Sequence, residues 1–73
     1  MKEKWRLSID LDGAEDIIIP FSSAGAAITH AEALIKQGFV VRDRRSDSTK
    51  YELQVYPIHT VRTFHVYEEV KVR

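Results

Sequence analysis

One segment of this 73-residue chain has the periodicity of a helix, and it constrains the fold more than any other feature. Ser22 and Ser23 can cap the free amides at its start, and Gly38 suits the left-handed residue that ends a helix. We therefore predict a helix within residues 22–38, packed against a sheet. The residues that recur at helical spacing on its apolar face are Ala24, Ala27, Ile28, Ala31, Leu34 and Ile35.

A second stripe flanks this apolar face and contains Ala26, His30, Ala33 and Gln37. Its residues are neither charged nor strongly apolar. Small residues there would let a sheet edge or a loop approach closely. The same spacing also suits helix–helix packing, so Ala26, His30 and Ala33 are candidates for contact with a second copy of the chain.

The rest of the chain alternates between apolar and polar residues, which is typical of strands with one covered face. We predict strands at 5–11, 17–21, 39–44, 51–56 and 60–67, with a polar turn at 45–50. Asp12 and Gly13 suit a tight hairpin turn, and Pro20 and Pro57 should end their strands. Three successive isoleucines at 17–19 predict a central strand or one buried on both faces. Irregular alternation in the last strand indicates either a bulge or a strand with two covered faces.

These elements predict a single α+β domain over residues 1–73, in ββαβββ order, with one helix on one face of a mostly antiparallel sheet. A single helix cannot cover both faces of a sheet, so we expect the other face to be exposed. A chain this short without cysteine has a small core and no disulfide, and we expect it to self-associate. The residues expected beneath the helix are Trp5, Leu7, Ile9, Leu11, Ile17, Ile19, Phe39, Val41, Leu53 and Val55.

Charge and motifs argue against several functional classes. Eleven basic and eleven acidic residues cancel, which disfavours indiscriminate binding to nucleic acid or membranes. The acidic turn (Asp10, Asp12, Glu15 and Asp16) lacks the pattern of a calcium loop, and the spacing of His30, His59 and His65 does not predict a zinc site. No catalytic motif and no signal-peptide or membrane-spanning segment is apparent. We expect a cytoplasmic, non-enzymatic protein without a cofactor.

The sheet face away from the helix is the main candidate binding surface. We expect Tyr56, His65 and Tyr67 to lie on it, with Arg6, Arg42 and Arg44 contributed by other strands. Aromatic side chains beside arginines are typical of the centre of a protein interface. The same composition can stack bases and hold phosphates, so nucleic acid or nucleotide binding is the alternative.

The segment Tyr56-Pro-Ile-His-Thr-Val-Arg-Thr-Phe-His-Val66 resembles the second signature of Sm-like proteins, a Tyr-x-His-x-Ile-x-x-Val pattern between the last two strands. The Sm fold places its helix before all strands, whereas here the helix follows two. We therefore carry no RNA-binding residues over from that family. The chain also looks like small accessory proteins of bacteriophages, being short, free of cysteine and built around one helix, with a Tyr-Pro-x-His-x-Val corner late in the chain.

Overall fold

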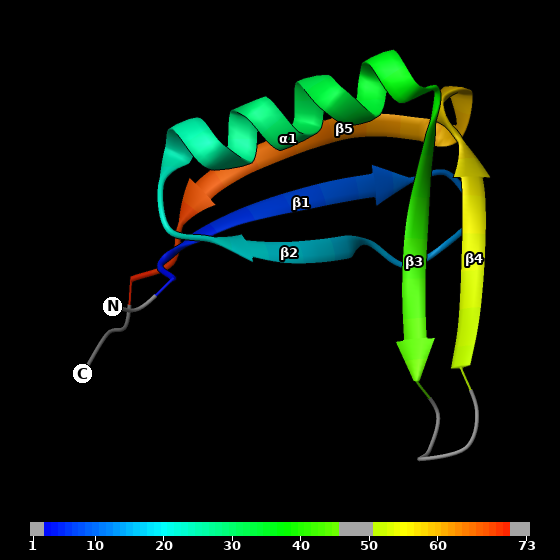
Figure 1. Cartoon of the computed structure of the whole chain (residues 1–73), viewed down its shortest axis with the longest axis horizontal. Coiled ribbons are helices and arrows are strands. Elements are labelled where there is room, and N and C mark those ends of the chain that lie inside the picture. The colour runs from blue at the N-terminus through cyan, green and yellow to red at the C-terminus, as the bar shows by residue number, and fades with distance from the viewer. Residues whose placement is uncertain (1–2, 46–50, 71–73) are drawn as a thin grey trace.

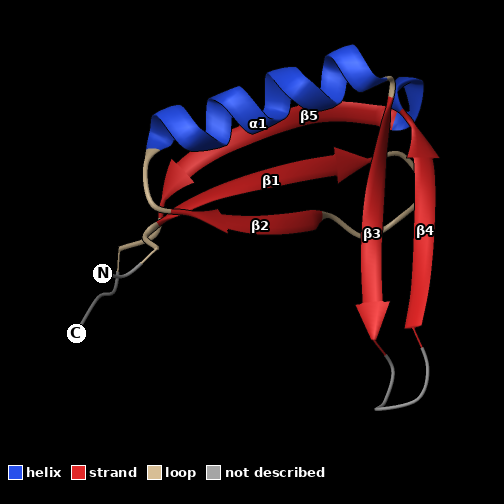
Figure 2. Ribbon diagram, viewed as in Figure 1, coloured by secondary structure: helices blue, strands red, loops and turns tan. Residues whose placement is uncertain are grey.

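The computed structural model describes residues 3–45 and 51–70, and for residues 44, 45 and 51 it describes the backbone only. The predicted turn at 45–50 therefore lies almost wholly outside the described residues. The elements follow the order β1 (Trp5–Leu11), β2 (Ile17–Phe21), α1 (Ala24–Gln37), β3 (Phe39–Arg45), β4 (Tyr51–Pro57), η1 (Ile58–Thr60) and β5 (Val61–Glu68). This confirms the α+β class and the ββαβββ order (Figures 1 and 2).

Both predicted helix caps are present. The Ser23 hydroxyl accepts a hydrogen bond from the Ala26 amide at 3.1 Å, which satisfies one free donor of the first turn. At the other end, Gly38 has a φ of 92° and its amide donates to the Leu34 carbonyl at 3.0 Å. Only glycine adopts this left-handed backbone without strain, so the helix stops where the sequence predicted.

The strands form two antiparallel sheets rather than one. The first has the order β2-β1-β5 and the second pairs β3 with β4. Helix α1 lies along the three-stranded sheet, and hairpin β3–β4 crosses the end of that sheet at a steep angle (Figure 1).

Strand β2 is an edge strand, so the prediction of a central or doubly buried position for its isoleucines was wrong. The central strand is β1, and Ile18 is 55% exposed on the helix-free face. The strand also continues through Pro20, which pairs in register with Arg6, instead of ending there. An edge strand tolerates proline because one of its sides needs no amide donor.

The bulge predicted in the last strand lies near its start. Asp10 pairs with Thr63 while the next residue, Leu11, pairs with Val61, so Arg62 is the extra residue. This shift brings Val61 onto the same face as Phe64, which explains the broken alternation of the sequence.

The core lies between α1 and the three-stranded sheet. Its buried members are Leu7, Ile9, Leu11, Ala27, Ala31, Leu34 and Val40. The buried stripe of α1 is narrower than predicted, because Ile28 and Ile35 are about half exposed.

Hairpin β3–β4 has the opposite orientation to the one predicted. Val40 is fully buried, whereas Phe39 and Val41 are exposed, and Leu53 and Val55 are 60% and 59% exposed. The prediction that α1 covers these four residues was wrong. The hairpin belongs to a separate sheet, so its inward face is set by its contact with the end of the core and not by the helix.

Candidate functional site

The outward face of hairpin β3–β4 is an apolar surface with no covering layer in the part of the chain that the structure describes. Val41 pairs with Val55, and Phe39 and Leu53 occupy neighbouring positions of the same face, because side chains alternate along each strand. Pro57 and Asp43, the register partners of Phe39 and Leu53, share this face at its two ends. We call these four residues the hairpin patch. All four are classed as exposed large hydrophobic residues.

The inward face of the hairpin holds the patch in place. Val40 is buried in the core, and its register partner Tyr56 packs against the core with its hydroxyl 3.3 Å from Gln54 Oε1. The Arg42 side chain extends to the loop between β1 and β2, where it donates to the Glu15 carbonyl. Its Nη1 lies 3.6 Å from Glu15 Oε1, and its guanidinium carbon lies 5.9 Å from the centre of the Tyr56 ring.

Arg42 and Tyr56 are thus structural residues of the hairpin. The Arg42 side chain is only 14% exposed, and its Nε is buried without a hydrogen-bond partner. A buried guanidinium with a carbonyl, a carboxylate and an aromatic ring around it is fixed in position. It anchors the hairpin to the β1–β2 loop, and little of it is available to bind a ligand.

A groove of about 440 Å³ separates the hairpin from edge strand β2. Ile17, Ile18 and Ile19 line one side, and Val41 and Arg42 line the other, with acidic residues at Asp16 and Asp43. Because Val41 belongs to both the groove and the hairpin patch, the apolar surface continues from the patch toward the exposed Ile18.

The six residues predicted as one binding surface lie in two places. Arg6, His65 and Tyr67 share the helix-free face of the three-stranded sheet, where Arg6 pairs in register with Tyr67 and His65 with Ser8. Arg42 and Tyr56 belong to the hairpin and face the core. The Arg44 side chain lies outside the described residues.

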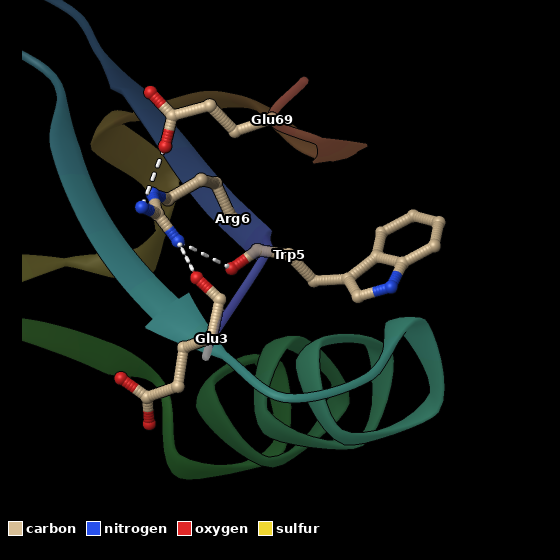
Figure 3. A network of polar contacts seen from close by, with 4 residues as sticks. All are labelled: Glu3, Trp5, Arg6 and Glu69. Carbon is tan, nitrogen blue, oxygen red and sulfur yellow. Dashed lines mark hydrogen bonds and ion pairs between the residues drawn. The ribbon is translucent and has the colours of Figure 1, made fainter. Parts of the chain in front are cut away.

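On the helix-free face, Arg6 is already bound by the chain itself. Its Nη2 lies 2.5 Å from Glu69 Oε1, and its Nη1 donates to the carbonyls of Glu3 and Trp5 at 2.7 and 3.2 Å (Figure 3). The Glu69 amide also donates to the Lys4 carbonyl at 2.8 Å. Arg6 therefore ties the segment before β1 to the end of β5.

A hollow of about 780 Å³ surrounds this arginine and is rimmed by Glu3, Glu68 and Glu69 as well as Lys4. Three carboxylates against two cations give the hollow an acidic rim. This rim is poorly suited to a phosphate, which needs unpaired positive charge.

The helix flank predicted as an oligomer contact is divided between the core and the surface. His30 is half-buried and its ring lies 5.3 Å from that of Phe21 on β2, whereas Ala26 and Ala33 are exposed. Across residues 3–45 and 51–70, no three histidine, aspartate or glutamate side chains come together as a metal site would require. Within the same residues, no helix has the length and apolar character needed to cross a membrane.

No protein-family model, no curated protein and no solved structure matches this chain. Its function must therefore be argued from its own residues. The likeness to bacteriophage accessory proteins and the cytoplasmic location stay predictions.

Sequence reasoning missed the hairpin patch as a functional surface, although it identified every residue of the patch as apolar. One signal for the correct orientation was available. Tyr56 and Arg42 have long, partly apolar side chains that can cover a core while their polar ends reach its rim. Their positions alternate with the patch residues, so a buried face containing Arg42 and Tyr56 requires an exposed face containing Val41 and Val55.

Proposed function

We propose that this protein is a small non-enzymatic interaction domain that binds a protein chain through the hairpin patch. The observation that carries the proposal is the exposure of Phe39, Val41, Leu53 and Val55 on one face of a two-stranded sheet. Contiguous apolar patches of a few hundred Å² on a monomer are often sites of association, because leaving them in water is unfavourable.

The chemistry of the patch favours protein over other ligands. Its four side chains consist of hydrocarbon and offer neither a nucleophile nor a proton acceptor. Aromatic and aliphatic residues of this kind form the centres of protein interfaces, where charged residues are depleted. The groove beside β2 extends the same surface toward Ile18, which enlarges the area a partner can contact.

A second candidate is nucleic-acid or nucleotide binding through the helix-free face. The observation in its favour is that Arg6, His65 and Tyr67 share that face. The ion pair of Arg6 with Glu69 and the acidic rim around it weaken the case. Oligonucleotide binding that strengthens at low salt would favour this candidate, because phosphate contacts release counterions.

Site-specific photo-crosslinking tests the main proposal. A photoreactive phenylalanine analogue replaces Leu53 in the patch or, as the control, Glu32 on the exposed side of α1. In the cells that make the protein, we expect adducts with a protein chain from position 53 and none from position 32. No adduct from position 53, or equal adducts from both positions, would refute the proposal.

A further inference from the structure

We infer that the partner of the hairpin patch is a second copy of this chain, and that the two copies pack patch against patch as a weak dimer related by a two-fold axis. This inference rests on the proposed function, since it names the occupant of the same surface. It goes beyond that function by fixing the symmetry, the strength and the residues of the contact.

The hairpin is covered on one of its two faces only, as far as the described residues show. A two-stranded sheet is marginal in water unless a third strand or a covering layer supports it. The inward face of β3–β4 has such support from Val40 and Tyr56, and the outward face has none among the described residues. A second hairpin stacked face to face about 10 Å away would supply the missing layer, as in a small sandwich.

The net charge of the chain does not oppose a two-fold contact. A two-fold contact places each surface against itself, so a charged patch would bring like charges together. The four side chains of the hairpin patch carry no charge, although Asp43 shares their face beside Leu53, and the whole chain has eleven basic and eleven acidic residues. Two copies therefore approach without net repulsion, and a net charge near zero favours association.

The size of the patch limits the strength of the contact. From the exposed fractions of its four side chains, each copy offers about 300 Å² of apolar surface, or about 600 Å² for the pair. Specific, stable interfaces bury about 1,200–2,000 Å² in total, so a contact of about half that size or less can only be weak and transient. The patch thus predicts a concentration-dependent dimer with a dissociation constant of roughly 0.01–1 mM rather than a permanent one.

Sedimentation equilibrium of the full chain tests the inference over concentrations from about 5 μM to about 1 mM, which span the expected range. The wild type should shift from monomer toward dimer as the concentration rises. Leu53→Lys should remain monomeric, with at least about a tenfold rise in the dissociation constant, because it places an ammonium group in the contact.

Ile35→Lys is the matched control. Ile35 is 54% exposed on α1, close to the value for Leu53, and its replacement adds the same charge and removes a similar side chain. This variant should dimerise like the wild type. Thermal melts at low micromolar concentration should be similar for the two variants, which shows that both are folded.

Three results would overturn the inference. These are a wild type that stays monomeric at the highest concentration, a Leu53→Lys variant that dimerises normally, and loss of dimerisation in Ile18→Lys but not in Leu53→Lys. The last result would place the partner on the β2 edge instead.

Crosslinks from position 53 to a different protein, together with a monomeric wild type, would refute the dimer and leave the proposed function standing. Absence of any crosslink would refute both.

Discussion

Two valines in the hairpin test which of its faces is covered in the single chain. Val40 on β3 is fully buried, whereas Val55 on β4 is mostly exposed and belongs to the hairpin patch. Replacing either with alanine removes the same carbon atoms and lowers strand propensity by a similar amount. The difference between Val40→Ala and Val55→Ala therefore reports their difference in burial.

The expected costs follow from the exposed fractions. Val40→Ala removes about two buried methyl-sized groups at about 0.8 kcal/mol each and leaves a small cavity, for a total of about 2–3 kcal/mol. Val55→Ala removes groups that are already largely in water, and should cost about 0.5 kcal/mol. In a domain of this size these values lower Tm by about 10–20 °C and by about 2–4 °C, respectively.

Urea unfolding at low micromolar concentration, followed by Trp5 fluorescence and circular dichroism, measures both free energies below the range where a second copy contributes. A domain this small has a total stability of roughly 3–5 kcal/mol, so Val40→Ala is best measured in a stabilised background. Equal costs for the two variants would show that the outward face is covered within the monomer. That result would refute the reasoning behind the hairpin patch.

Four further predictions test other parts of the structure. Gly38→Ala should lower the free energy of unfolding by about 1 kcal/mol, because the site has space for a methyl group but a φ of 92°. Gly25→Ala, inside α1 with its nearest neighbour 4.0 Å away, should raise the free energy of unfolding by about 0.5–1 kcal/mol in the same urea assay. This variant is the stabilised background in which Val40→Ala can be measured. Glu69→Gln should lower the free energy of unfolding by about 0.2–1 kcal/mol at low salt and by less in molar salt, because its ion pair with Arg6 is partly exposed and salt screens it. Equal losses at both salt concentrations would contradict an ionic role for the pair. Arg42→Met keeps much of the apolar part of the side chain but removes the contacts to Glu15. Hydrogen exchange of the β3–β4 amides should therefore accelerate more than that of the β1 amides. Equal acceleration in both would argue against Arg42 as a local anchor of the hairpin.

The local elements could be predicted from the sequence because their signals are local. The Ser23 cap, the Gly38 terminator and the alternation in β1 each depend on a few neighbouring residues. The bulge near Arg62 was one of two interpretations of the apolar residues of both parities in that strand, the other being a strand with two covered faces, and only the register decides between them. The edge position of β2 could not, because three isoleucines in a row suit a central strand equally well and strand order depends on contacts between distant segments.

The candidate site failed to follow from the sequence for a related reason. Alternation shows which residues share a face, but it does not show which of the two faces is covered. In β3 and β4 one face carries Val40, Arg42, Gln54 and Tyr56, and the other carries Phe39, Val41, Leu53 and Val55 together with Asp43 and Pro57. Hydrophobicity alone assigns the second set to the core, and this was the assignment that the structure contradicts.

The physical reason for the reversed hairpin also explains why its exposed face is a site. The three-stranded sheet and α1 already form a closed two-layer core around Leu7 and Ile9, which leaves only its end for the hairpin to cover. Val40 fills that end, and Arg42 secures the crossing by reaching Glu15, a contact that a shorter aliphatic residue could not make. Once the hairpin is fixed in this way, Leu53 and Val55 have no apolar surface of their own chain to contact among the described residues. A second chain would bury these two side chains, and their exposure links the way this small domain folds to the association we propose for it.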